Sequence, residues 1–114
     1  MYDNLADGIT AMIGVIQKDY YNTTYNRVHD NSKVLEDFNN SIEIIPGSKY
    51  IKIISRGGAH SFIVREPGIM STKGVEFKVG DILMSASFSA PAKYFSRGNV
   101  LDGTFQNVRW TGAM

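Results

Sequence analysis

The chain has 114 residues, of which 43% are apolar, so it is long enough for one domain with a hydrophobic core of its own. It contains no cysteine, which excludes disulfides, thiolate metal ligands and a cysteine nucleophile, and suits a reducing compartment. The net charge of +1 is unevenly divided, because residues 1–48 carry seven acidic and three basic side chains, whereas residues 49–114 carry four acidic and nine basic ones.

The N-terminal region predicts a helix over about residues 4–21. Asp3 or Asn4 can cap its start, and Gly8 and Gly14 weaken the prediction by about 1 kcal/mol each relative to alanine. Six apolar residues recur at the spacing of one helix face: Leu5, Ile9, Met12, Ile13, Ile16 and Tyr20.

A second, shorter helix is expected in the acidic half. Residues 20–26 are polar and aromatic, which is typical of a loop or of a frayed continuation of the first helix. The second helix is predicted to start after Asn31 or Ser32 and to end at residues 39–41.

Strand patterns begin after this point. Residues 41–45 predict a short strand that Pro46-Gly47 stops, and residues 49–56 and 60–65 predict a hairpin with a two-residue turn at Gly57-Gly58. That turn fixes six pairs, with Ile51–Val64, Ile53–Phe62 and Ser55–His60 on the core face and Tyr50–Arg65, Lys52–Ile63 and Ile54–Ser61 on the other.

The C-terminal region predicts further strands. Residues 75–79 alternate apolar and polar side chains, turn at residues 80–81 and continue as a second strand over residues 82–88, which Pro91 ends. Residues 105–110 are expected to form an edge strand.

The order of the elements, helices first and strands after, predicts an α+β fold. One or two N-terminal helices are expected to pack on a mostly antiparallel sheet, which is either open or curled towards a barrel, in a single domain over residues 1–114. The N-terminus does not have the pattern of a signal peptide, and the longest apolar stretch, residues 11–16, is too short to span a bilayer. We therefore expect a cytoplasmic protein without membrane contact.

The second half resembles a group of small, uncharacterised proteins of tailed bacteriophages, especially marine ones, over roughly residues 49–103. Five segments carry the resemblance: Lys49–Ile54, Ala59–Val64, Gly80–Leu83, Ser85–Lys93 and Arg97–Asn99. Phe88 and Ser89 depart from that group, in which an aromatic residue (often tryptophan) and a lysine are common at these positions. The resemblance implies a viral origin and a location in the host cytoplasm, and it implies no reaction.

The two histidines predict no catalytic site. His29 adjoins Asp30, and neighbours in a helix or loop do not face each other. His60 adjoins Ser61, and adjacent residues of a regular strand point to opposite faces, so they are not expected to act as a nucleophile and its base. We expect His60 to be structural, bonded to Ser55 or to a backbone carbonyl.

No metal-ligand spacing and no phosphate-binding glycine loop occur, so no metal site, cofactor or catalytic residue is predicted. A hydrolase whose two carboxylates converge only in space stays an open alternative.

The strongest functional pattern is a basic and aromatic segment over residues 93–99. Lys93 and Arg97 flank Tyr94 and Phe95 in a stretch expected to be exposed after a proline. Cations can neutralise phosphates and rings can stack on unpaired bases, although the same rings could instead pack on the sheet as a lid. Further side chains could extend this surface: Arg109 and Trp110, and Tyr50, Lys52 and Arg65 on the hairpin.

The leading hypothesis is a non-enzymatic phage accessory or assembly protein that acts through a binding surface. The net charges of −4 on residues 1–48 and +5 on residues 49–114 indicate attraction between the two halves, within one fold or within a homo-oligomer, or else a protein partner or an anionic ligand. The alternative is a weak, sequence-independent nucleic-acid-binding protein that uses Lys93, Tyr94, Phe95, Arg97 and Arg109. The third is an unrecognised hydrolase.

Overall fold

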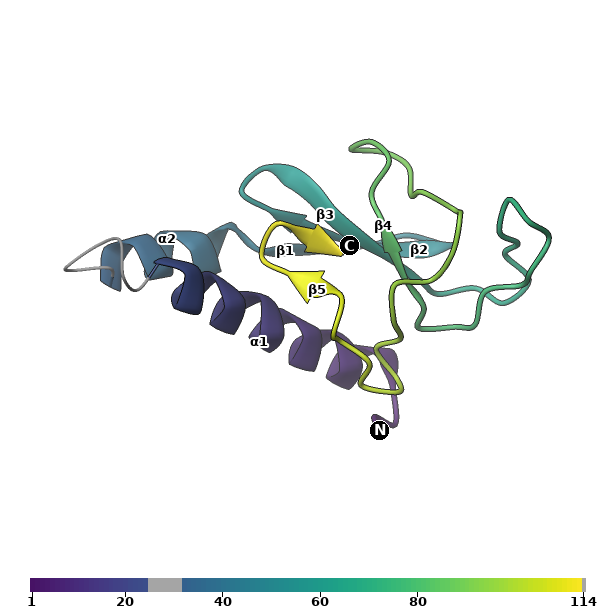
Figure 1. Cartoon of the computed structure of the whole chain (residues 1–114), viewed down its shortest axis with the longest axis horizontal. Coiled ribbons are helices and arrows are strands. Elements are labelled where there is room, and N and C mark those ends of the chain that lie inside the picture. The colour runs from purple at the N-terminus through teal and green to yellow at the C-terminus, as the bar shows by residue number, and fades with distance from the viewer. Residues whose placement is uncertain (25–31, 114) are drawn as a thin grey trace.

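The computed structural model describes residues 1–24 and 32–113, and it confirms the predicted α+β fold. Figure 1 shows the elements in chain order: α1 (Leu5–Thr24), α2 (Ser32–Ser41), β1 (Glu43–Pro46), β2 (Tyr50–Ser55), β3 (Gly58–Val64), β4 (Ile82–Met84), β5 (Val108–Arg109) and β6 (Gly112–Ala113). Strands β1-β2-β3-β4 form an open antiparallel sheet in that order, so of the two predicted arrangements the open sheet is found. A small second sheet pairs β5 with β6.

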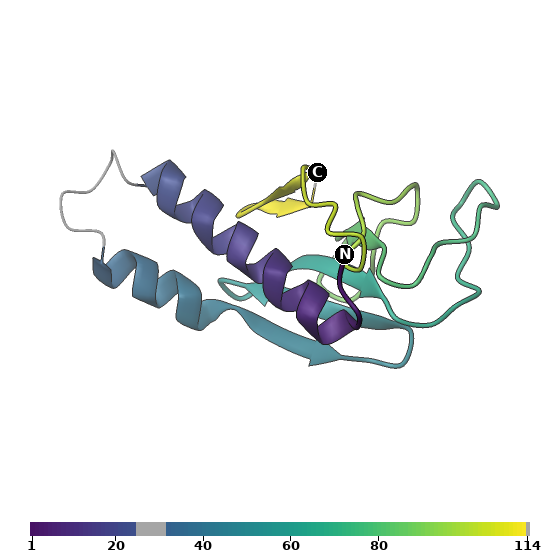
Figure 2. The same ribbon diagram turned by 90° about the horizontal axis from the view of Figure 1, so that it is seen from below.

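Helix α1 forms as predicted and runs three residues further, to Thr24. Asn4 caps it, because its Oδ1 accepts a hydrogen bond of 2.9 Å from the backbone N–H of Asp7, while its Nδ2 donates to the Asp7 carboxylate. The buried face of the helix contains Ile9, Met12, Ile16 and Tyr20. Figure 2 shows α1 crossing one face of the four-stranded sheet.

Three aromatic rings join the two helices to the C-terminus. Tyr20 stacks on Phe38 of α2 with 3.9 Å between ring centroids, and Trp110 meets both rings edge-on. The carboxylate of Asp19 accepts a 2.8 Å hydrogen bond from the backbone N–H of Trp110. We call Tyr20, Phe38 and Trp110 the aromatic cluster.

The register predicted for the β2–β3 hairpin is wrong. The turn lies at Arg56-Gly57, whose φ angles of 54° and 79° are the positive values that a type I′ turn requires. His60 is an extra residue in β3, since Ile53 pairs with Ser61 but Ile54 pairs with Ala59. The bulge shifts the remaining pairs to Tyr50–Val64, Ile51–Ile63 and Lys52–Phe62.

The shift gives the sheet two covered faces. Ile51, Ile53 and Ile63 belong to the core that α1 covers. Phe62 and Val64 point the other way, into a second core that includes Ile69 and Phe77 from the following loop.

The second predicted strand pair is also wrong, because only residues 82–84 form a strand there. The backbone of residues 97–98 occupies the outer edge of β4, where Arg97 N–H donates to Ile82 O and Ile82 N–H donates to Gly98 O. Residues 75–79 are thereby excluded from the sheet and form a loop closed by a bridge between Met70 and Glu76. The predicted edge strand over residues 105–110 is reduced to the two residues of β5.

Candidate ligand-binding groove

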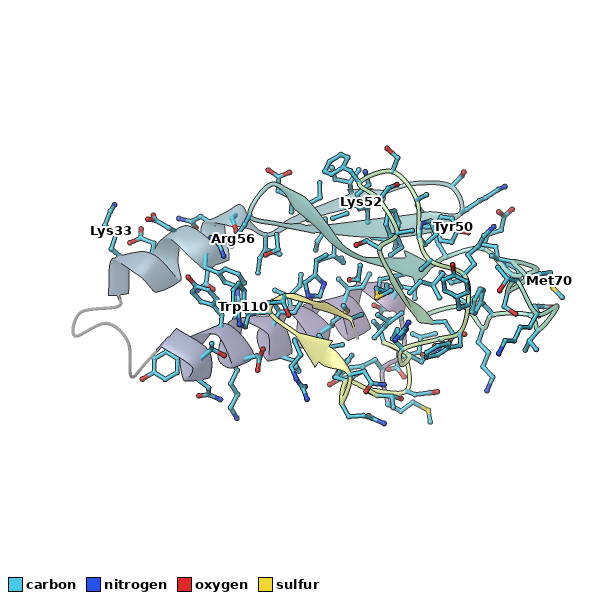
Figure 3. All side chains as sticks on the ribbon, turned by 45° about the horizontal axis from the view of Figure 1, so that its top comes forward. Lys33, Tyr50, Lys52, Arg56, Met70 and Trp110 are labelled. Carbon is cyan, nitrogen blue, oxygen red and sulfur yellow. The ribbon has the colours of Figure 1, made fainter. Side chains whose placement is uncertain are left out.

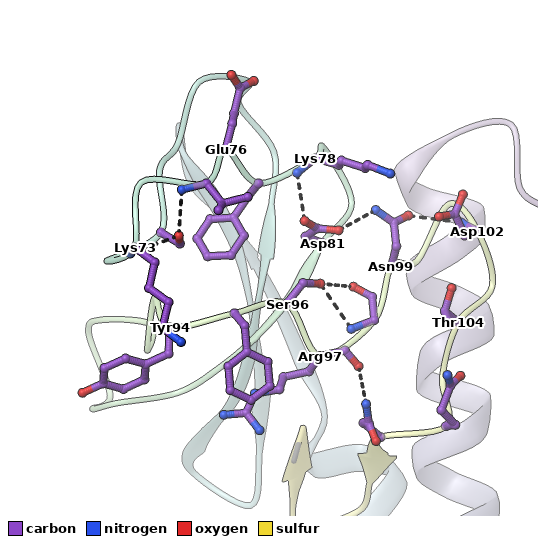
Figure 4. A pocket seen from close by; sticks show the side chains of 17 residues that line it. Lys73, Glu76, Lys78, Asp81, Tyr94, Ser96, Arg97, Asn99, Asp102 and Thr104 are labelled. Carbon is purple, nitrogen blue, oxygen red and sulfur yellow. Dashed lines mark hydrogen bonds between the residues drawn. The ribbon is translucent and has the colours of Figure 1, made fainter.

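Two loops that are distant in sequence face each other across an open groove of about 700 Å³. One loop contributes residues between 71 and 81 and the other contributes residues between 94 and 107. Figure 4 shows the lining side chains, which include Lys73, Tyr94 and Arg97. A cavity of this size accepts a small molecule or a short stretch of a polymer.

A buried polar network joins the two loops. The Nδ2 of Asn99 donates to the Oδ1 of Asp81 at 2.9 Å and to the carbonyl oxygen of Val79 at 3.1 Å. The other carboxylate oxygen of Asp81 accepts from the backbone N–H of Lys78, and the Oδ1 of Asn99 accepts from the N–H groups of residues 101 and 102. Since both side chains are buried and bonded, they hold the walls of the groove in place.

Gly98 allows the second loop to pass close to itself. Its φ of 145° and the contact that a Cβ would make with the carbonyl of Thr104 leave room only for glycine. The neighbouring Asn99 and Thr104 form a bridge at this point, so the loop folds back along the groove.

One end of the groove is aromatic and basic. Tyr94 and Phe95 are 58% and 56% exposed, so they do not pack on the sheet as a lid. The guanidinium of Arg97 lies 4.0 Å from the centroid of Phe95, and Lys73 extends beside Tyr94 (Figure 4). We call Lys73, Tyr94, Phe95 and Arg97 the basic-aromatic end.

The cations of this end have no carboxylate partner. Within residues 1–24 and 32–113, no lysine or arginine nitrogen lies within 4.0 Å of a carboxylate oxygen. The Nε atom of Arg97 is buried and has no hydrogen-bond partner. Three carboxylates also line the groove. Asp81 is hydrogen-bonded to Asn99 and to the backbone of Lys78, and Glu76 points away from the other lining side chains (Figure 4). Asp102 follows the network residue Asn99 by three positions and lies at the other end.

The structure brings together three of the five residues predicted from the basic and aromatic segment. Tyr94, Phe95 and Arg97 line the groove. Lys93 lies on the opposite side of the segment, beside Tyr50 and Lys49, in a second hollow of about 410 Å³. Arg109 is on β5, outside the lining, where its Nη1 donates to the carbonyl oxygens of Gln106 and Val108.

Lys73 and Lys78 are the groove cations that sequence reasoning missed. Lys78 lies in the predicted strand over residues 75–79, and Lys73 lies about twenty positions before Tyr94, in a stretch for which the sequence predicts no element. No local pattern indicates that the two side chains meet, since only the arrangement of the two loops brings them together.

His60 and Ser61 do interact, contrary to the prediction from regular strand geometry. The bulge turns the two side chains toward each other, so His60 Nδ1 lies 2.9 Å from Ser61 Oγ. His60 Nε2 lies 2.6 Å from the carbonyl oxygen of Arg109, which requires the proton on Nε2 and leaves Nδ1 to accept from the serine hydroxyl. The predicted bond to a backbone carbonyl is therefore present, and the predicted alternative, Ser55, pairs with Gly58 instead.

This pair belongs to the core. Ser61 has no exposed surface, so its hydroxyl offers no accessible nucleophile. Burial lowers the pKa of His60, although its bond to Arg109 acts in the opposite direction. His29, the other histidine considered above, lies outside the described residues.

Among the residues that the structure describes, no three histidine, aspartate or glutamate side chains gather in a way that could hold a metal ion. No helix in the same part of the chain combines the length and the apolar character needed to span a bilayer.

Comparison with known proteins finds no matching family model, no similar curated protein and no similar solved structure. The resemblance of residues 49–103 to phage proteins therefore stays a prediction.

Proposed function

We propose that this protein is a non-enzymatic accessory protein of a bacteriophage that binds unpaired nucleic acid, weakly and without sequence specificity, in the groove. The observation that carries the proposal is the basic-aromatic end, where two half-exposed rings stand beside cations that no carboxylate neutralises. The phage origin rests on the sequence resemblance alone.

The exposed rings support stacking as the mode of binding. Tyr94 and Phe95 each leave more than half of their surface open to solvent, which is unusual for side chains of this size. Stacking of one base on one ring contributes about 1–3 kcal/mol and tolerates every base, because each base has a flat face. A surface of this kind binds without sequence specificity.

The cations support a phosphate-bearing ligand. Lys73 and Lys78 are exposed, and the guanidinium of Arg97 is oriented by its ring contact. Each phosphate that they neutralise releases counterions and makes the affinity dependent on salt. The excess of positive charge in residues 49–114 would attract the same ligand from a distance.

A single strand fits these features better than a duplex. Paired bases are stacked on each other and present only their edges, so they leave no face free for Tyr94 or Phe95. Duplex readers insert a helix or a strand pair into a groove. The groove described here is instead walled by loops.

Fluorescence anisotropy with a labelled oligothymidylate and with a matched duplex tests the proposal. We expect saturable binding to the single strand at low salt, which falls as salt rises, and a loss of at least about tenfold in affinity for the double variant Lys73→Glu, Arg97→Glu. Lys33→Glu is the control for a charge reversal outside the groove, because this exposed lysine lies on α2 at the opposite end of the molecule (Figure 3).

Thermal unfolding of each variant separates binding from folding. Wild-type protein that does not bind at low salt would overturn the proposal. An equal loss in the Lys33→Glu control would overturn it as well, since net charge rather than the groove would then determine binding.

Self-association at β1 is a second candidate function, which an exposed sheet edge favours. All four residues of β1 are exposed, and Ile44 and Ile45 keep 47% and 45% of their surface open. An apolar edge strand can pair with another chain, although Pro46 lacks the N–H that a long pairing needs. Light scattering checks this role: a defined oligomer that Ile44→Lys dissociates supports it, and a monomer at high concentration contradicts it.

A further inference from the structure

We infer that the nucleic-acid surface continues from the groove, across the segment of residues 92–95, onto the part of the four-stranded sheet around Tyr50 and Lys52. A bound single strand would then occupy both sides of that segment. The inference rests on the proposed function, and it extends that function to a second set of residues on the β2–β3 hairpin.

Consecutive side chains point into the two hollows. Tyr94 lines the groove, whereas Lys93 lines the second hollow together with Lys49 and Tyr50. The backbone of Lys93 is fixed between them, because its carbonyl accepts a 2.8 Å hydrogen bond from the N–H of Thr72. A nucleic-acid strand that extends past Tyr94 would therefore next reach Lys93, the neighbouring residue of the protein chain.

The second hollow continues onto the sheet. A third hollow of about 310 Å³ shares Lys49 and Tyr50 with it and adds Lys52 and Phe62. Figure 3 shows Lys52, Tyr50 and Met70 following one another along the molecule, and Met70 lines the second hollow. The second and third hollows are thus continuous from Lys93 to the middle of β2, and the segment of residues 92–95 lies between them and the groove.

The far end of this surface repeats the chemistry of the groove. The ammonium of Lys52 lies 4.0 Å from the ring centroid of Phe88, which is the distance that separates Arg97 from Phe95. Phe88 is 52% exposed, so a base can stack on its ring. A cation beside a half-exposed ring therefore occurs at both ends of the surface.

The loop that carries Lys49 is held in place by hydrogen bonds to residues that follow β3. The Nη1 of Arg65 donates to the carbonyl of Gly47 at 2.9 Å, and the carbonyl of Lys49 accepts from the N–H groups of residues 65 and 66. Arg65 and Lys49 are both exposed, but the guanidinium of Arg65 is held by its bond to Gly47. The hairpin residues that the inference assigns to the ligand are consequently Lys49, Tyr50 and Lys52.

The length of the ligand distinguishes this surface from the groove alone. We expect a labelled oligothymidylate of about four nucleotides to bind through the groove, and one of about sixteen to bind more tightly because it also reaches the sheet. The double variant Lys49→Glu, Lys52→Glu should lower the affinity for the long oligonucleotide at least about tenfold and leave the short one unchanged. It should also reduce the slope of log affinity against log salt by about 1.4 for the long ligand, about 0.7 for each lost phosphate contact.

Phe88→Ala is the second variant, because it removes an exposed ring without changing charge, and Lys33→Glu is again the control. The inference is overturned if the long oligonucleotide binds no more tightly than the short one, or if neither sheet variant weakens it while Lys73→Glu, Arg97→Glu does. That result would leave the proposed function intact. If neither oligonucleotide binds, the proposed function fails and the inference fails with it.

Discussion

The two ends of the molecule use the same residue types in opposite ways. At the helix end, Tyr20 and Phe38 are buried and stack on each other, and Trp110 meets both rings edge-on. At the loop end, Tyr94 and Phe95 are more than half exposed, and Phe95 contacts the guanidinium of Arg97. Aromatic rings that pack against each other stabilise a fold, whereas solvent-exposed rings beside cations are available to a ligand.

A cation accompanies both groups, but its surroundings differ. Arg56 lies 5.6 Å from the ring of Trp110, and its backbone N–H is held by the hydroxyl of Ser41. Arg97 lies closer to its ring, and its Nε has no partner. The bond to Ser41 ties the hairpin turn to α2, whereas the contact with Phe95 orients the guanidinium of Arg97 at the groove.

The largest expected effect is on stability at the helix end. Phe38→Ala should lower the free energy of unfolding by about 3 kcal/mol, because the ring is 3% exposed and its removal leaves a cavity beside Tyr20. Phe95→Ala, which also removes one phenyl ring, should change it by less than about 0.5 kcal/mol. Urea denaturation of the two variants measures the contrast, and equal losses would show that the rings do not differ in role.

The helix end of this contrast is partly readable from sequence, for local reasons. The sequence left open whether Tyr94 and Phe95 pack on the sheet or stay exposed, whereas the helical spacing of α1 and the Asn4 cap are contained within a few residues. Such features need no knowledge of distant partners.

The sequence-based predictions are wrong where two turn positions are locally possible, or where segments distant in sequence contact each other. Residues 56–58 allow the turn to form one residue earlier than predicted, and the bulge at His60 then restores the alternation of β3. Residues 75–79 have the pattern of a strand, but the backbone at residue 97 takes the edge that they would need. The groove depends on the same event, so Lys73 could not be assigned to it from sequence.

A pair of glycines in α1 tests how the two ends are joined. A Cβ at Gly8 would overlap the carbonyl of Val100, the residue that follows Asn99 of the groove network. Gly8→Ala should therefore lower the free energy of unfolding by about 1–3 kcal/mol despite the better helix propensity of alanine.

Gly14→Ala is the matched control. Nothing lies within 4 Å of a Cβ at Gly14, so this variant should raise stability by about 0.5–1 kcal/mol. Circular dichroism melts of the two variants give the sign of each change. Stabilisation by both substitutions would mean that α1 does not approach the second groove loop as closely as described.

The smallest expected effect is a pH dependence confined to the link between the sheet and the C-terminal hairpin. Burial lowers the pKa of His60 below its usual value near 6.5, so the unfolded chain binds its proton more readily than the folded one does. The contribution of His60 to stability is thus fully present above about pH 6.5, and it decreases as the pH falls toward the lower pKa of the folded state.

Denaturation of the wild type and of His60→Gln between about pH 7.5 and 5 isolates this contribution. The wild type should lose more stability than the variant across that range, because titrating groups other than His60 are common to both. His60 bonds to the carbonyl of Arg109, next to Trp110, so fluorescence of the single tryptophan should report the same transition. Binding of a short oligonucleotide by folded protein should depend on pH no more in the wild type than in the variant, since His60 does not line the groove. Parallel pH profiles for the stability of the two proteins would show that the histidine is as easily protonated in the fold as in water.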